Sequence, residues 1–191
     1  MIGLKTGVIQ LQLIRICEVN ALGKKKAKDT EKTLVEKMLD AKHVQYEGVS
    51  FATHQDGDVM QISEEEMAVP QHQVYKTLVL TGNKTGPLVG MVPLDMHIDY
   101  KKLSSVSGNK KVGMVPLKDL VKTSGYEHGA NNPVGIHARH NYPIYFANEA
   151  REVGTIIVSA GKIGRSVRLN AEDLAKLVGA KFADFATETE Q

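Results

Sequence analysis

Residues 74–80 read VYKTLVL and predict the strongest β-strand in the chain. Its branched and aromatic side chains favour extended backbone because they pack well on a pleated sheet. Lys76 lies inside the predicted strand. Such a lysine is either an outward-facing, solvated side chain or a cation that the sheet holds at a site.

The segments on both sides mix helix and strand patterns without regular alternation. Leu34, Val35, Met38 and Leu39 share one helical face behind an Asp or Thr cap, and Asn170 caps a helix that Gly179 ends. Further helices are expected at residues 63–69, 99–106 and 116–122, and further strands at residues 44–51, 89–94, 112–115, 144–146, 155–159 and 181–185. A glycine turn joins two strands within residues 159–169, and the acidic tail at 187–191 is expected to fray. This order predicts an α+β domain with a mixed β-sheet.

Composition indicates one soluble domain. A chain of 191 residues with 42% hydrophobic content can bury a substantial core. Cys17 is the only cysteine, which excludes an internal disulfide and favours a reducing, cytoplasmic location. No run reaches the roughly 18 apolar residues of a membrane span, so no membrane partner is expected. A net charge of +2 is too small for nucleic-acid binding by charge alone.

A composition break separates the start of the chain from the rest. Gly23 is followed by lysines at positions 24, 25, 26 and 28. We expect residues 1–28 to be an N-terminal extension with a basic junction, and residues 29–186 to form the folded domain.

Residues 123–143, TSGYEHGANNPVGIHARHNYP, are the most unusual segment, with glycines, prolines and histidines but no apolar periodicity. Glycines let main-chain amides approach a ligand closely, and the polar side chains beside them add hydrogen-bonding groups. The segment is therefore either a pocket wall built from main-chain amides or a long surface loop rich in turn-forming residues.

The common catalytic motifs are not found in this sequence. It contains neither a phosphate-binding loop nor GxGxxG, and His128, His137 and His140 do not form a recognised metal-binding pattern. Cys17 lies outside the expected core, and neither Ser124 nor Ser159 lies in a GxSxG elbow. What remains is a lysine in a strand and glycine-rich loops, which suit stabilisation of an oxyanion by an ammonium and main-chain amides. No metal and no cofactor are expected.

Three separated motifs in the same order carry a family resemblance. They are HQVYKTLVL at 72–80, SGYxxGxxxPxG at 124–135, and VSAGKIGRSVRLNAEDLAKLVGAKFAD at 158–184. Over residues 30–185 the chain resembles bacterial Cys-tRNA(Pro) deacylases of the YbaK type, free-standing relatives of the editing domain inserted in prolyl-tRNA synthetases. The resemblance implies a mixed sheet that forms a partly open barrel flanked by helices, and removal of mischarged amino acid from tRNA.

The resemblance also implies the roles of individual residues. Lys76 matches the required lysine, and Gly129 matches the glycine whose backbone faces the ester, so both are expected to be catalytic. Substrate contacts are expected from Phe51, Tyr126, His128, Asn132, Pro133, Ser159, Gly161 and Ser166. Phe51 matches a pocket tyrosine only loosely, Ser166 stands where many relatives have aspartate, and Asn132 stands where they often have serine.

The implied substrate is mischarged tRNA(Pro), with cysteine removed by attack of its own thiol on the ester. Prolyl-tRNA synthetase is a possible partner. Candidates for contact with acceptor-stem phosphates are the lysines within 24–28 together with Lys162, Arg165 and Arg168. Two alternatives stay open: an Ala-tRNA(Pro) deacylase on the same fold, and a non-catalytic module associated with a synthetase.

Overall fold

The computed structural model describes residues 31–188 except residue 58 and residues 65–66. The expectations for residues 1–28, including Cys17, therefore lie outside the described residues, and the short helix expected at 63–69 lies partly outside them. The helices of the described part are α2 (Leu34–Ala41), α3 (Tyr100–Ser107), α4 (Leu117–Ser124), α5 (Pro133–His140), α6 (Glu149–Val153), α7 (Ala171–Val178) and the 3₁₀ helix η2 (Gln71–Gln73).

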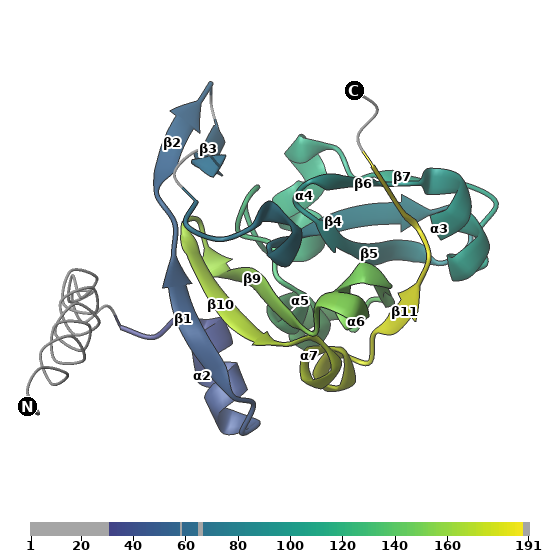
Figure 1. Ribbon diagram of the computed structural model, residues 1–191. Helices are drawn as coiled ribbons and strands as arrows, with labels where there is room; N and C mark the ends of the chain where they lie inside the picture. The colour runs from purple at the N-terminus through teal and green to yellow at the C-terminus, as the bar shows by residue number, and fades with distance from the viewer. Residues whose placement is uncertain (1–30, 58, 65–66, 189–191) are drawn as a thin grey trace, which may run out of the picture. The chain divides into compact units, whose positions relative to one another are not determined.

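A five-stranded mixed sheet forms the centre of the domain (Figure 1). Its strand order is β11 (Lys181–Ala183), β8 (Ile144–Ala147), β5 (Gly86–Pro93), β4 (Tyr75–Gly82) and β7 (Val112–Met114). The β11–β8 and β8–β5 pairs are parallel, whereas β5–β4 and β4–β7 are antiparallel. The strand predicted at 74–80 is therefore confirmed as β4, inside a mixed sheet.

A second, antiparallel sheet adjoins the first. It contains β1 (Tyr46–Ser50), β10 (Arg165–Asn170) and β9 (Thr155–Lys162). A parallel bridge between Val74 and Ile157 joins β9 to the start of β4. Two small sheets complete the strands: β2 (Thr53–Asp56) with β3 (Val59–Ile62), and β6 (Met96–Ile98) with β12 (Ala186–Glu188). The described strands form a mixed, partly open arrangement and no closed barrel.

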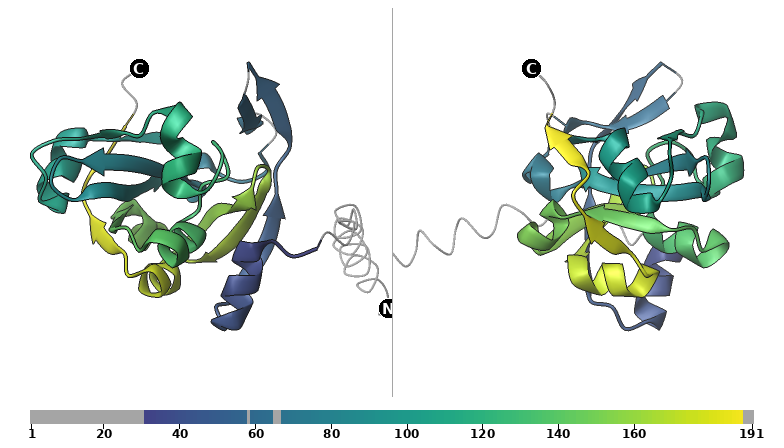
Figure 2. Two further views of the ribbon diagram at one scale, coloured as in Figure 1. Left: turned by 180° about the vertical axis from the view of Figure 1, so that it is seen from behind. Right: turned by 90° about the vertical axis from the view of Figure 1, so that its right-hand side faces the viewer.

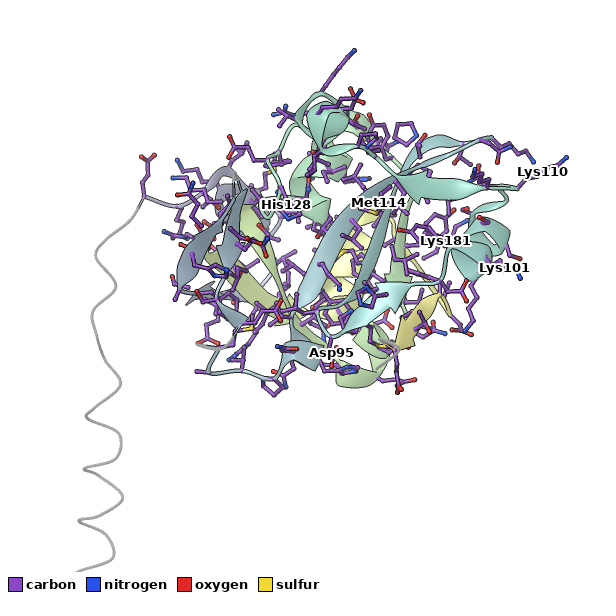
Figure 3. The ribbon with its side chains drawn as sticks, turned by 90° about the horizontal axis from the view of Figure 1, so that it is seen from above. Asp95, Lys101, Lys110, Met114, His128 and Lys181 are labelled. Carbon is purple, nitrogen blue, oxygen red and sulfur yellow. The ribbon has the colours of Figure 1, made fainter. Side chains whose placement is uncertain are left out.

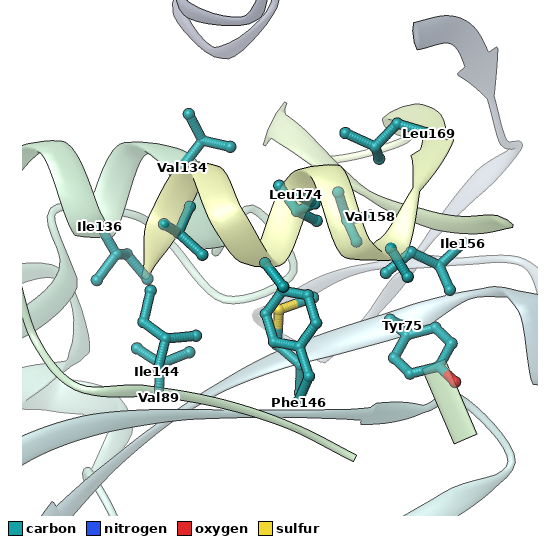
Figure 4. Packing of buried hydrophobic residues seen from close by; sticks show 14 of the residues in the cluster. Tyr75, Val89, Val134, Ile136, Ile144, Phe146, Ile156, Val158, Leu169 and Leu174 are labelled. Carbon is teal, nitrogen blue, oxygen red and sulfur yellow. The ribbon is translucent and has the colours of Figure 1, made fainter. Parts of the chain in front are cut away.

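Two hydrophobic clusters cover the two faces of the central sheet. Because side chains alternate along a strand, Tyr75 and Val79 of β4 join one cluster and Leu80 joins the other. The first cluster packs under α2, α5 and α7, and Figure 2 shows α2 and α7 on the same side of the strands. Figure 4 shows Phe146 pointing from the sheet toward the helix that carries Leu174; both are fully buried.

Local signals set the helix ends. Thr33 and Glu36 form a capping box at α2, and Asn170 accepts hydrogen bonds from the N–H groups of Glu172 and Asp173 at α7. Gly179 follows α7 in the left-handed conformation, as the sequence predicts. Leu34 differs from its expected position on the apolar face, because its side chain is 57% exposed.

Several segments are more ordered than the sequence predicts, and β2, β3, β6 and α6 form where no element was expected. Part of the tail expected to fray forms β12, because its backbone pairs with β6. The segment 123–143 is not one long loop, since α5 occupies its centre. Asn132 caps α5 by accepting from the N–H of Gly135, and Pro133 occupies the first turn, where a missing N–H costs nothing.

Candidate active site

A cavity of about 640 Å³ opens beside the start of β4. Its wall comes from six parts of the chain: the end of β3 with the residues after it, β4 with the residue before it, the segment from Leu94 to His97 of β6, β7 with α4, the turn before α5, and the β9–β10 hairpin. The polar residues of the wall are Gln61, Glu64, Lys76, Thr77, His97, His128, Asn131, Ser159 and Ser166, and apolar side chains such as Val74, Leu78, Val115 and Leu120 supply much of the rest.

The cavity lies where β4 lacks a neighbouring strand on one edge. On that edge β4 pairs with β7 only from Leu80 onward, and β9 meets the chain only at Val74. The N–H of Leu94 donates to the carbonyl of Val74 at 2.7 Å, and the N–H of Val115 donates to that of Val79 at 3.1 Å. Since alternate residues of an antiparallel strand bond to opposite sides, the main-chain groups of Thr77 face this open edge.

Lys76 contributes a cation to the wall of this cavity. Its side chain is about half buried, and burial lowers the pKa of its ammonium, while the carboxylates of Glu64 and Asp95 act in the opposite direction. Among the described residues, the ammonium makes no hydrogen bond and no ion pair. A partly desolvated cation without a fixed partner is available to an electron-rich atom of a ligand.

Gly129 and His128 form the part of the wall between α4 and α5. Gly129 has φ of +79°, a left-handed conformation that a side chain would strain. The N–H of Ala130 donates to the carbonyl of Glu127 at 3.1 Å and closes this turn. Figure 3 shows His128 beside the strands that border the cavity. The turn thus presents main-chain groups and one imidazole to the cavity.

Two serines face each other across the β9–β10 hairpin. Ser159 and Ser166 are register partners at a point where the pairing shifts, and both line the cavity. The hydroxyl of Ser159 accepts a hydrogen bond from the N–H of Gly161 at 3.2 Å. Ser166 is only 2% exposed. The structure therefore brings together five of the ten residues that the resemblance implied: Lys76, Gly129, His128, Ser159 and Ser166.

The other five are not among the residues that line the cavity. Asn132 and Pro133 start α5, as described above. The ring of Tyr126 packs against Gly135, whose missing side chain leaves it room, and the guanidinium of Arg139 lies 5.9 Å from the centre of that ring.

Phe51 and Gly161 are likewise held by contacts within the fold. The N–H of Phe51 donates to the carbonyl of Gly164 at 2.8 Å, next to the hairpin turn. Gly161 has φ of +86°, and a side chain there would come within 3.4 Å of Val35, Tyr126 and Asn132. The positive φ and the close packing explain why residue 161 is a glycine, whereas the hydrogen bond of Phe51 fixes its main chain only.

Two residues that the resemblance did not imply also form the wall. Thr77 and Asn131 line the cavity and are at most 9% exposed. The hydroxyl of Thr77 and the amide oxygen of Asn131 are buried, and neither has a hydrogen-bond partner among the described residues. A buried polar atom without a partner costs about 1–3 kcal/mol. In the sequence, the only signal for Thr77 as a wall residue is its position next to Lys76.

The basic residues of the hairpin are largely engaged in ion pairs. The guanidinium of Arg165 donates to the buried carboxylate of Glu36 at 3.0 Å, and that of Arg168 donates to Glu47 at 3.2 Å. Burial raises the pKa of Glu36, but hydrogen bonds from the N–H of Thr33 and from Arg165 outweigh it, so the pKa is lowered overall. Arg165 therefore stabilises the fold, and among the hairpin cations expected to contact phosphates only Lys162 is exposed. The lysines within 24–28 lie outside the described residues.

The loop histidines do not form a metal site. His137 and His140 lie on α5 outside the cavity wall, and the ring of His140 stacks on Tyr142 with centroids 4.7 Å apart. Over residues 31–188, gaps excepted, no group of three or more potential metal ligands comes together. Likewise, no helix in the described part of the chain is long and apolar enough to cross a membrane.

The sequence is similar to those of known proteins. A family model described as the aminoacyl-tRNA editing domain matches residues 54–177. A protein of Enterococcus faecalis assigned as the Cys-tRNA(Pro)/Cys-tRNA(Cys) deacylase EbsC is 39% identical over 163 residues, which cover 85% of this chain and 98% of that one.

Solved structures show the same fold at low sequence identity. A protein assigned as a trans-editing enzyme for prolyl-tRNA synthetase matches with a TM-score of 0.65 and 19% identity, over 80% of this chain and 94% of that one. A hypothetical protein matches with a TM-score of 0.69 and 17% identity, over 80% of this chain and 99% of that one. On the family match and the identity to the Enterococcus protein, the chain belongs to the aminoacyl-tRNA editing domain family.

Proposed function

We propose that this protein is a free-standing aminoacyl-tRNA deacylase that removes cysteine from mischarged tRNA(Pro). The observation that carries the proposal is the ammonium of Lys76, which has no hydrogen bond or ion pair among the described residues, in one cavity with Gly129, Ser159 and Ser166. The assignment of the Enterococcus relative supports the choice of cysteine and of tRNA(Pro). A cytoplasmic location follows from this substrate.

The cavity suits electrostatic catalysis better than attack by a protein nucleophile. No cysteine occurs among the described residues, and neither cavity serine is hydrogen-bonded to a histidine there. A serine without a base is a weak nucleophile. Lys76 and the main-chain amide of Gly129 instead hold the ester carbonyl and stabilise the negative charge that develops on its oxygen.

The cysteine substrate then supplies its own nucleophile. Its thiol sulfur bonds to the ester carbonyl carbon, the bond from that carbon to the ribose oxygen breaks, and the thiol proton ends on the ribose hydroxyl. The products are a cyclic thioester of cysteine, which water can open, and tRNA with a free 3′ end. In this scheme the protein positions the ester, and its own side chains form no covalent bond.

Affinity for tRNA is expected to be weak without a partner. The net charge is only +2, and two of the hairpin cations are held in ion pairs. Because affinity for nucleic acid rises with the number of phosphates neutralised, a second protein that holds the tRNA would increase the rate. Prolyl-tRNA synthetase is the proposed partner.

The test compares deacylation of Cys-tRNA(Pro), Ala-tRNA(Pro) and Pro-tRNA(Pro) by the purified full chain. We expect the parent to release cysteine from Cys-tRNA(Pro) faster than it releases the other amino acids. The variant Lys76→Ala should release little cysteine. Preference for the alanine ester would assign the protein as an Ala-tRNA(Pro) deacylase. Failure to release any amino acid, with or without prolyl-tRNA synthetase, would indicate a non-catalytic module.

A further inference from the structure

An exposed apolar strip continues from the cavity onto the surface of α4. Of the six large hydrophobic residues that are exposed in the described part of the chain, three lie here: Met114 at 43%, Leu117 at 61% and Val121 at 54%. Leu117 and Val121 are one helical turn apart and therefore share one face of α4. Met114 and Leu117 also line the cavity, and Met114 is labelled in Figure 3.

A row of positive charge runs beside this strip. Lys118 and Lys122 are also one turn apart on α4, and both are exposed. Neither makes a hydrogen bond or an ion pair with another described residue. Asp119 is the one acidic residue of the helix. The exposed surface of α4 thus combines an apolar strip with two cations that have no partner within the described part of the chain.

We propose that the strip formed by Met114, Leu117 and Val121 binds the terminal nucleobase of the aminoacyl-tRNA, with Lys118 and Lys122 close to the phosphates that precede it. This proposal rests on the proposed function, because it takes the ester to lie at Lys76. A base attached to the ribose of that ester must lie within one nucleotide of the cavity, where the strip begins. Its flat apolar face can cover aliphatic side chains while its edges stay in water.

The dimensions of the strip favour a base over a protein partner. A stable protein interface buries about 800 Å² on each side, which is far more than three side chains can supply. One base needs only a small apolar surface, and covering aliphatic side chains with its ring removes apolar area from water, which favours binding. The neighbouring lysines also match a phosphate backbone, whereas a purely apolar partner would leave them unpaired.

A double comparison of protein and substrate tests the proposal. The substrates are cysteinylated acceptor-stem hairpins that carry adenine on the terminal ribose or carry no base there. The proteins are the parent chain and the variant Leu117→Ser/Val121→Ser, whose changes are on the surface. Removal of the base is expected to lower kcat/KM about tenfold for the parent and less than twofold for the variant.

Leu34→Ser is the matched control, because Leu34 is similarly exposed at 57% but lies on α2. It should respond to base removal as the parent does. If removal of the base lowered kcat/KM by the same factor in the parent and in the double variant, the proposal would be overturned. The proposal would also be overturned if the only defect of the double variant were that prolyl-tRNA synthetase no longer stimulates it. That result would assign the strip to a protein partner. Failure of the proposed function would appear separately, as no deacylation of the intact hairpin by the parent.

Discussion

The two ends of β4 each bury an asparagine, but only one of them is fully hydrogen-bonded. Beyond the far end, Asn109 is 7% exposed and its amide oxygen accepts from the N–H groups of Lys84 and Thr85 at 2.8 and 3.1 Å. Its amide nitrogen donates to the hydroxyls of Thr85 and Ser107, each at 2.9 Å. At the cavity end, Asn131 is 9% exposed and its amide oxygen has no partner among the described residues.

This difference distinguishes polar groups that stabilise the fold from polar groups that are available to a ligand. Gly82 leaves the space that Asn109 fills, so the far end is closed and its polar groups are satisfied. At the cavity end, Lys76, Thr77 and Asn131 are partly or fully buried, and the ammonium, the hydroxyl and the amide oxygen have no hydrogen-bond partner between residues 31 and 188, gaps excepted. Natural proteins retain such costs mainly at functional sites. The comparison therefore supports placing the proposed site at the cavity end, without use of the family match.

The largest expected effect is the loss of activity on replacing the cavity cation. Lys76→Met should lower the rate of Cys-tRNA(Pro) deacylation by about 10²–10³-fold, since removal of one oxyanion donor typically costs that much. Single-turnover assays with excess protein separate this effect from tRNA binding. Lys181→Met is the control, because Lys181 is exposed on β11 outside the cavity wall. Equal rates for Lys76→Met and the parent would remove the lysine from the mechanism.

The second effect concerns stability at the opposite end of β4. Asn109→Ala should lower the free energy of unfolding by about 2–3 kcal/mol, because it leaves the N–H groups of Lys84 and Thr85 without an acceptor. Urea denaturation followed by circular dichroism measures the change. The folded variant should deacylate at the parental rate. A variant that stays as stable as the parent would show that water replaces the amide at no cost.

The third effect is a pH dependence that follows from Lys76. Burial lowers the pKa of its ammonium below 10.5, so the proton leaves at lower pH than from a free lysine. If the cation holds the ester, the enzyme-catalysed rate, corrected for spontaneous hydrolysis, should fall as the pH rises through this pKa. A corrected rate that rises through the same range would instead indicate that neutral Lys76 acts as a base.

The smallest effect is expected for the unpartnered asparagine. Asn131→Ala should change the free energy of unfolding by less than about 1 kcal/mol, since the lost amide oxygen makes no hydrogen bond within the described structure. The same urea experiment compares it with Asn109→Ala at equal burial and equal chemistry. A loss as large as that of Asn109→Ala would mean that Asn131 has a structural partner after all.

Much of the fold could be predicted because its signals are local. The branched residues of β4, the glycine turn between β9 and β10, and the Asn170 cap of α7 each specify their own element. Helix α5 was missed even though Asn132 and Pro133 form a recognisable start, because its glycine and histidines resemble loop composition. The strand β12 could not be predicted, since it depends on pairing with the distant β6.

The site could be predicted only in part. Sequence motifs indicated Lys76, Gly129 and the two serines, but they did not distinguish residues that line the cavity from those that build the fold behind it. Tyr126 and Gly161 have residue types set by close packing, which is visible only in three dimensions. Thr77 and Asn131 were missed because an absent hydrogen-bond partner is a property of the folded chain.

The most direct test of the central claim is the free energy of unfolding of Lys76→Met at neutral pH, measured by urea denaturation beside the parent. If the cavity end holds a cation at a cost to stability, a side chain of similar length without charge should leave the protein as stable or up to about 1 kcal/mol more stable. This result should accompany the loss of deacylation. A loss of 2 kcal/mol or more, like that expected for Asn109→Ala, would contradict the account and make Lys76 a structural residue.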